Sequence, residues 1–213
     1  VCGYSGFLLS KCSKVSFMLD VVSFSAQEQL FINARSVNAF TGQPVSVDQL
    51  RAIYDLCKWG PTSMNCQPMR LVFVTSPQGK EKLRACLSPG NIEKTMAAPV
   101  TAIVAMDVAF FDKLPTLTPI PNAREMFADN ADKAQSAAMR NSWLQAAYFI
   151  IAARAQGLDA GPMGGFNADA VNAAFFADTT IKANMLVNLG YGDASANYPR
   201  GPRLDFDDVA TVV

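Results

Sequence analysis

The chain has 213 residues and no histidine, and its 18 lysine and arginine residues balance 18 aspartate and glutamate residues. Zero net charge without runs of like charge argues against nucleic-acid binding, and the absence of histidine excludes Ser-His-Asp triads, Cys-His proteases and histidine-based zinc sites. The length suits one domain, and the charged fraction of 17% lies below the roughly 25% of ordinary domains, which predicts a large apolar subunit interface.

The five cysteines are widely spaced and contain no CxxC pair. They predict neither a disulfide framework nor a metal site, and they favour a reducing cytoplasm. No apolar run approaches the roughly 20 residues of a membrane span, so we expect no membrane segment. Residues 1–17 precede Met18 and are interpreted as an N-terminal extension or a wrongly assigned start, and residues 18–213 as a single domain.

Capping signals predict the first two helices. Ser25 and Glu28 have the spacing of a capping box and begin a helix at the start of the domain. Ser46 and Gln49 repeat this spacing and begin a second helix, which ends at Gly60.

Two buried strands and a third helix follow in chain order. A polar loop at residues 61–68 leads into a strand at 71–74, and Ser-Pro begins a helix over 76–86. Residues 99–106 are apolar and partly β-branched, which predicts a buried strand. The prolines within residues 114–121 predict irregular structure there.

The last third of the domain is dominated by one helix, predicted over residues 131–156. Its segment 143–153 is apolar nearly all round, which indicates burial on every side, as in a central helix at a subunit interface. A glycine-rich loop at 157–166 precedes a helix over 167–176, and residues 185–191 predict a strand. Helices and strands mix without strict βαβ alternation, so we expect an α+β fold.

Four polar or glycine-rich segments interrupt this apolar chain. Residues 35–38, Arg-Ser-Val-Asn, carry donors that suit a phosphate or a sugar chain, or they form an ordinary helix end. Residues 61–68, PTSMNCQP, hold side-chain amides that can read the edge of a heterocycle, or they make a plain turn. Residues 90–94, GNIEK, end in a lysine that is either functional or solvated. Residues 161–166, GPMGGF, let backbone N–H groups approach a flat ligand.

In this order the four segments resemble the FMN-dependent nitroreductase superfamily, over about residues 25–205. Residues 35–40 meet the family's opening pattern, except that Asn38 stands where relatives have a second basic residue. Residues 61–68 meet its Pro-Ser/Thr-Ser-x-Asn-x-Gln-Pro loop almost in full, and residues 157–166 resemble its flavin-face loop. The resemblance implies a three-layer α+β fold with a mostly antiparallel sheet flanked by helices. It also implies a homodimer in which the C-terminal segment, residues 193–213, adds a strand to the partner's sheet.

The resemblance further implies FMN at the dimer interface and the residues that contact it. These cofactor contacts are Arg35, Ser36, Asn38, Thr62, Ser63, Asn65, Asn91, Lys94, Asn141, Pro162, Met163, Gly164, Gly165, Arg200 and Arg203. Arg200 and Arg203 are similar to the family's phosphate clamp, to which Arg35 and Ser36 contribute. Asn38 is expected to hydrogen-bond the flavin or ribityl chain without supplying charge.

Within this set the resemblance divides the roles further. Thr62, Ser63 and Asn65, with Asn141, reach the flavin from the other subunit. Gly164 and its neighbour Gly165 bring backbone N–H groups near the flavin N5 atom. Lys94 is the catalytic candidate, because a fixed cation near N1 and the C2 carbonyl stabilises reduced flavin. No protein general acid is assigned.

The activity implied is ping-pong hydride transfer from NADH or NADPH through FMN to a second substrate, which requires no histidine. The sequences of the segments KWGPTSMNCQP and GNIEKTMAAPVTAIVA resemble one subgroup, the malonic semialdehyde reductases of bacterial pyrimidine degradation. Arg124, in the proline-rich insertion 113–130, is the candidate for the substrate carboxylate, with Arg70 and Arg140 as rivals. The alternatives are a broad nitroreductase or quinone reductase, a non-catalytic flavin-binding protein, and a dimeric module without a cofactor.

Overall fold

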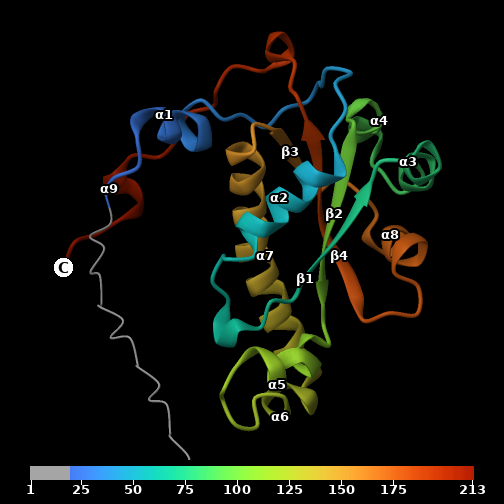
Figure 1. Cartoon of the computed structure of the whole chain (residues 1–213), viewed down its shortest axis with the longest axis vertical. Helices are drawn as coiled ribbons and strands as arrows, with labels where there is room; N and C mark the ends of the chain where they lie inside the picture. Colours follow the sequence, from blue (N-terminus) through green and yellow to red (C-terminus); the bar gives the residue numbers. More distant parts are fainter. Residues whose placement is uncertain (1–19) are drawn as a thin grey trace, which may run out of the picture.

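A four-stranded antiparallel sheet lies at the centre of the fold, in the order β1-β2-β4-β3 (Figure 1). Its strands are β1 (Met69–Val74), β2 (Val100–Asp107), β3 (Asp159–Met163) and β4 (Ile181–Gly190). The computed structural model describes residues 20–213, so the interpretation of residues 1–17 lies outside the described part. The predicted strands at 71–74, 99–106 and 185–191 are confirmed as parts of β1, β2 and β4.

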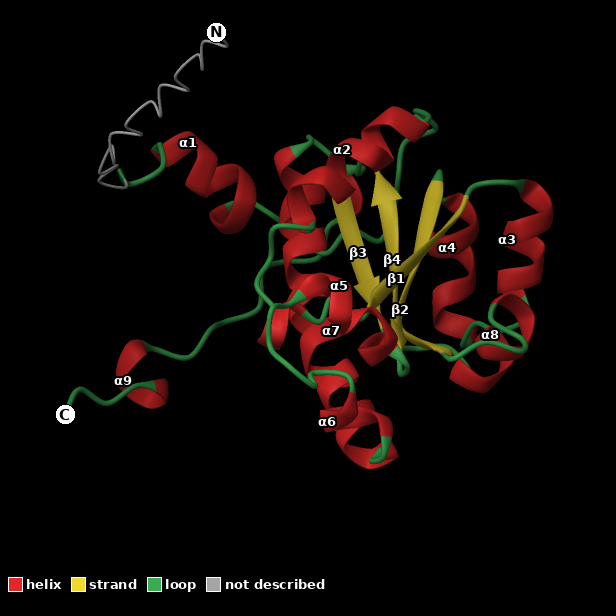
Figure 2. Cartoon of the chain, turned by 60° about the horizontal axis from the view of Figure 1, so that its bottom comes forward, coloured by secondary structure: helices red, strands yellow, loops and turns green. Residues whose placement is uncertain are grey.

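Helices cover both faces of the sheet and make three layers (Figure 2). One face carries α2 (Val47–Cys57) and the long α7 (Ala131–Ala155), and the other carries α3 (Pro77–Arg84), α4 (Ile92–Ala97) and α8 (Ala168–Phe175).

Strand β2 has side chains in both apolar cores, because neighbouring residues of a strand point to opposite faces. Val100 and Val104 pack in the core under α2 and α7, which includes Phe149. Ile103 packs in the core on the other side of the sheet, with Leu83 of α3. Each fully buried side chain of this size stabilises the fold by about 1.5–3 kcal/mol, so the α+β sandwich forms around β2.

The remaining elements are short. They are α1 (Phe24–Gln27), continued by a π-helical turn at Glu28–Ile32, α5 (Leu114–Leu117), α6 (Glu125–Ala128), α9 (Phe206–Val209), and 3-10 turns at Ser63–Asn65, Pro89–Asn91, Phe110–Lys113 and Ala194–Ala196. Both α1 and the C-terminal segment that ends in α9 lie away from the three layers (Figure 2). None of the described helices is long and apolar enough to cross a membrane.

The predicted helix starts are confirmed in part. Ser46 and Gln49 form the predicted capping box of α2. The first helix begins earlier than predicted, because Ser23 rather than Ser25 is its N-cap and accepts from the Ala26 amide at 3.3 Å. Asn167 caps α8 as predicted.

Two other predictions were wrong. Residues 114–117 form α5 instead of irregular structure, since Pro115 falls in the first helical turn, where the missing N–H is not needed. The segment predicted as a glycine-rich loop contains β3, which pairs with β4. Two further predictions concern a dimer, which a single chain does not test. In the single chain Trp143 and Tyr148 of segment 143–153 are 45% and 42% exposed, and the described residues 193–213 contain no strand. Burial of that segment at a subunit interface and addition of a strand to a partner's sheet therefore stay predictions.

Candidate functional site

Three of the four predicted segments meet beside α4. The Lys94 Nζ donates to Asn38 Oδ1 at 3.3 Å, and the Asn91 Nδ2 donates to the Gly165 carbonyl at 2.7 Å. Ser36 forms a bridge with Ala160 of β3. An ammonium, two amides and the double-glycine loop therefore lie together, although the chain separates them widely.

Local structure explains how α4 presents its polar side chains. The turn Pro89–Asn91 leads directly into α4, so Asn91 and Lys94 stand three residues apart, one helical turn, on the same face. The Ser88 amide donates to the Gly165 carbonyl at 3.1 Å, which fixes this turn to the glycine loop.

Gly164 is the open position of that loop. A Cβ built there meets no heavy atom within 4 Å, whereas one at Gly165 would lie 2.4 Å from Asn91 Nδ2. Gly164 also lies exposed at the surface. Its backbone is therefore accessible to a flat ligand that stands beside Lys94.

The predicted phosphate-binding arginines converge on the end of the first helix. The Arg35 guanidinium donates to the Tyr198 carbonyl, and Arg200 Nη2 donates to the Ile32 and Ala34 carbonyls at 2.5 and 3.0 Å. Backbone carbonyls thus hold each of the two guanidinium groups in place.

Arg203 is placed differently. Its Nη1 donates to the Gly201 and Pro202 carbonyls, both at 2.9 Å, which are its neighbours in the chain. In the described part of this single chain, Arg203 makes no hydrogen bond to the other predicted contacts.

The loop 61–68 forms a second group of predicted contacts. The Ser63 amide donates to Asn141 Oδ1 of α7 at 2.8 Å, and Asn65 Nδ2 donates to the Leu117 carbonyl at 2.8 Å. Met64, Asn65 and Gln67 have φ values of 55°, 54° and 40°. Residues other than glycine rarely adopt this left-handed backbone conformation, so the loop backbone is strained. Such strained residues often cluster at binding sites.

The two groups are well separated within one chain. In Figure 1 the loop after α2 lies beside the middle of α7, whereas residues 33–40 and α4 lie at the far end of the sheet. The single chain therefore does not bring Thr62, Ser63, Asn65 and Asn141 to Lys94.

Arg124 and Arg70, two of the three candidates for the substrate anion, are already paired with aspartates. Arg124 Nε lies 2.9 Å from Asp112 Oδ1, and Arg70 Nη2 lies 2.8 Å from Asp107 Oδ2. Arg140 is exposed, and among residues 20–213 no carboxylate lies within 4.0 Å of its guanidinium. It directly precedes Asn141.

A buried polar cluster beneath α4 escaped the sequence analysis. Lys80 is only 5% exposed, and Thr95, Thr101 and Asn188 are fully buried. Burial lowers the pKa of Lys80 to about 8. A signal existed in the sequence: Lys80 lies three residues before the core residue Leu83, on the apolar side of the predicted helix.

The cysteines behave as core side chains. Cys57 is fully buried, and Cys66 is buried too. Burial raises the pKa of both thiols to about 11, which disfavours the reactive thiolate.

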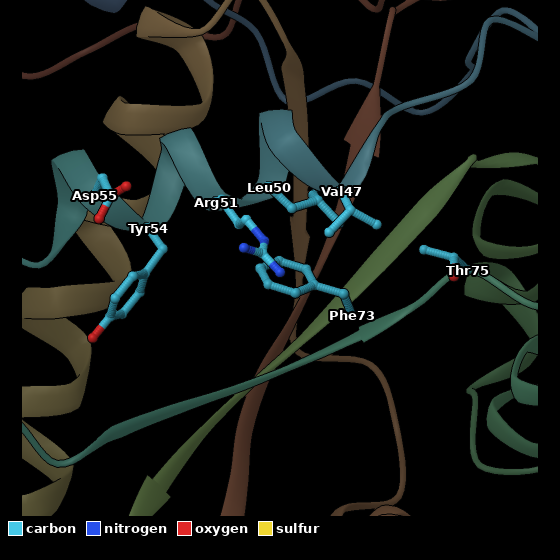
Figure 3. Close-up of a pocket in the computed structure, with 7 residues that line it drawn as sticks. All are labelled: Val47, Leu50, Arg51, Tyr54, Asp55, Phe73 and Thr75. Carbon is cyan, nitrogen blue, oxygen red and sulfur yellow. The ribbon is translucent and has the colours of Figure 1, made fainter.

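A cavity of about 520 Å³ lies elsewhere, between α2 and β1 (Figure 3). Val47, Leu50, Arg51, Tyr54 and Asp55 of α2 line it, opposite Phe73 and Thr75. It contains none of the predicted cofactor contacts. The cavity lies next to β1, which is an edge strand of the sheet.

Comparison with known proteins assigns the family. The sequence model of the Nitroreductase family matches residues 33–191, most of the chain. The chain belongs to the nitroreductase family. A relative from Burkholderia lata, provisionally named as an NADH dehydrogenase/NAD(P)H nitroreductase, is 54% identical over 194 residues, which cover 91% of this chain and 100% of the relative.

Solved structures share the nitroreductase fold. A provisionally named nitroreductase from Bacillus subtilis superposes with a TM-score of 0.79 at 22% identity, over 90% of this chain and 100% of its own. Another from Exiguobacterium sibiricum, crystallised in complex with FMN, has a TM-score of 0.78 at 22% identity, over 92% of this chain and 100% of its own. The expected α+β nitroreductase fold, an antiparallel sheet flanked by helices, is thereby confirmed.

Proposed function

We propose that this nitroreductase-family protein is an FMN-dependent NAD(P)H oxidoreductase that works as a homodimer. The observation that carries the proposal is the meeting of Lys94, Asn38 and Asn91 with the open backbone of Gly164. The name of the Burkholderia lata relative, which includes NAD(P)H, and the FMN in the Exiguobacterium sibiricum structure support the same assignment.

The donor set suits FMN chemically. A flavin has a polar pyrimidine edge, a flat apolar ring and a dianionic phosphate. Asn91 and Lys94 supply hydrogen-bond donors for the edge, Gly164 leaves room for the ring, and the guanidinium groups of Arg35 and Arg200 match the phosphate.

Bound FMN would supply the redox chemistry, which is hydride transfer between NAD(P)H and a second substrate. The role of the chain is to bind FMN and to set the electrostatic environment of its ring. Lys94 places a positive charge where the reduced ring carries negative charge, and Asn38 Oδ1 orients that ammonium group. Asn38 thus occupies the family's basic position without adding charge.

The homodimer assignment rests on exposed apolar surface and on an open sheet edge. Trp59, Trp143, Leu144 and Tyr148 are exposed on or next to α2 and α7, and the loop 61–68 packs on the same helix α7. Strand β1 is an edge strand, whose outer backbone groups are available for pairing. A partner's C-terminal segment would cover this edge, and the partner's loop 61–68 would complete the site.

The test of this function is spectroscopic. Purified protein, reconstituted with FMN if necessary, is reduced anaerobically with NADPH or NADH, and the flavin band is expected to bleach. Lys94→Met is expected to retain FMN but to be reduced at least tenfold more slowly, because it loses the charge beside the reduced ring. Lys113→Met, which removes an exposed lysine from another part of the surface, is the matched control. Protein that cannot be loaded with FMN would overturn the proposal.

For the second substrate we propose malonic semialdehyde, reduced to 3-hydroxypropionate. The subgroup resemblance of the sequence supports this choice, and the small anion needs a cation at the site. Arg140 is the better candidate of the three arginines, because Asp112 neutralises Arg124 and Asp107 neutralises Arg70.

The substrate proposal is tested by steady-state kinetics with malonic semialdehyde, the neutral aldehyde propanal and a nitroarene. Arg140→Ala is expected to raise KM for malonic semialdehyde about tenfold and to leave the propanal rate unchanged, and Arg124→Ala is the control. Efficient turnover of the nitroarene alone would instead favour the broad nitroreductase, which the name of the relative also suits.

A further inference from the structure

A buried lysine stands beneath the candidate flavin site. Lys80 extends from α3 into the protein, where its Nζ donates to the Thr95 carbonyl of α4 at 2.8 Å and to Thr101 Oγ1 of β2 at 2.7 Å. Its side chain therefore joins the helix that carries Lys94 to the central strand of the sheet.

A directed chain of hydrogen bonds leads from this lysine to the glycine loop. Thr101 Oγ1, which accepts from Lys80, donates to Asn188 Oδ1 at 2.7 Å. Asn188 Nδ2 donates to Thr95 Oγ1 at 3.4 Å, and Thr95 Oγ1 donates to Met163 Sδ at 3.6 Å. In each of these hydrogen bonds the donor lies nearer to Lys80 along the chain of bonds than the acceptor does. The hydrogen bonds therefore polarise one another in one direction, from Lys80 towards Met163, the residue before Gly164.

Within residues 20–213 this charge has no partner of opposite sign. Among the residues that the structure describes, no carboxylate lies within 4.0 Å of Lys80 Nζ. A buried ion without a counter-ion destabilises a fold, and an apolar side chain of similar length in the same place is usually tolerated as well or better. The hydrogen bonds to Thr95 and Thr101 offset only part of this cost, so the stability of the fold alone does not explain the lysine.

We propose that Lys80 is a positioning residue of the flavin site, whose charge and hydrogen-bond chain hold α4 and Met163 in place and favour the reduced, more negative flavin. The proposal rests on the FMN-dependent function above. It assigns the missing counter-charge to the reduced cofactor, which Lys94, Asn91 and the glycine loop would hold.

The experiment compares the midpoint potential of bound FMN in wild type and Lys80→Met. Lys80→Met is expected to weaken the preference for reduced over oxidised FMN about tenfold, which corresponds to a potential about 30 mV lower for two electrons. Lys80→Gln, which keeps a donor and loses the charge, is expected to shift in the same direction and serves if the methionine variant does not fold. Lys82→Met is the matched control, because it removes an exposed charge from the same helix and is expected to leave the potential unchanged.

Further measurements separate a positioning role of Lys80 from a purely structural role and from an effect of net charge. Urea unfolding of the FMN-free proteins is expected to show that Lys80→Met still folds cooperatively, because relief of the buried charge opposes the loss of its two hydrogen bonds. A less stable variant with an unchanged potential would assign Lys80 a purely structural role and overturn the inference. An equal potential shift in Lys82→Met would overturn it as well, since net charge alone would explain the effect. If wild type fails to bind FMN in titrations of the FMN-free protein, the proposed function itself is wrong.

Discussion

The contact between β3 and the segment that carries Arg35 and Asn38 depends on one glycine. A Cβ built on Gly161 would lie 2.4 Å from the Val37 carbonyl oxygen, about 1.0 Å inside the 3.4 Å at which ordinary contact begins. That oxygen belongs to the backbone, so no side-chain rotation relieves the clash. Gly161→Ala must therefore move residues 35–38 away from the sheet.

The cost follows from two terms. Overpacking of a tight contact costs about 1–3 kcal/mol, and the hydrogen bond from the Val37 amide to the Ala160 carbonyl, 3.2 Å long, contributes about 1 kcal/mol. Gly161→Ala is thus expected to lower the free energy of unfolding by about 2–4 kcal/mol, and Tm by roughly 4–15 °C for a chain of this size. Since residues 35–38 contribute to the cofactor site, the affinity for FMN is expected to fall at least tenfold.

Thermal and urea unfolding of the FMN-free protein measure this effect, at equal protein concentration because the stability of the proposed homodimer would depend on concentration. The matched control is Gly42→Ala, whose added Cβ meets no heavy atom within 4 Å. A Gly161→Ala protein as stable as Gly42→Ala would refute the packing of residues 35–38 against β3.

Other outcomes test single contacts. Gly164→Ala is expected to leave the unfolding midpoint unchanged, since its Cβ meets no atom within 4 Å, and to weaken FMN binding about tenfold; unchanged FMN affinity in a fluorescence titration would place the ring elsewhere. Because burial favours the neutral thiol and raises the pKa of Cys57 and Cys66 to about 11, only about one thiol in a thousand is ionised at pH 8, and Ellman's reagent is expected to react with them only after unfolding. Arg70→Ala leaves the half-buried Asp107 without its ion-pair partner and is expected to lower stability by about 1–2 kcal/mol; a double-mutant cycle with Asp107→Asn that gives no coupling would contradict this.

Short-range sequence patterns were sufficient to predict helix starts where neighbouring residues alone form the N-cap. The capping box at Ser46 and the Asn167 cap need only side chains within three residues, and both formed as predicted. The first helix shows the limit, because Ser23 and Ser25 are equally competent caps and the choice between them depends on the chain around them.

The pairing of β3 was not predictable from its own residues. Asp159–Met163 contains a glycine and a proline, both poor strand formers, and it forms a strand because β4 supplies partners and Val37 packs closely against Gly161. The position of Lys80 on the apolar side of its helix indicates burial, but its partners Thr95 and Thr101 come from two other elements, so no local pattern specified these contacts.

The sequence by itself determined the fold class, the order of the main helices and strands, and the identity of the polar segments, because residue type and short spacing specify these properties. Only the tertiary structure decided which segments meet. It joined Asn38, Asn91, Lys94 and Gly165. It also placed Asn65 against α5 and Ser63 against α7, and paired Arg124 with an aspartate. These contacts link residues far apart in the chain, and sheet pairing and the packing of both cores fix their distances, which no local pattern encodes.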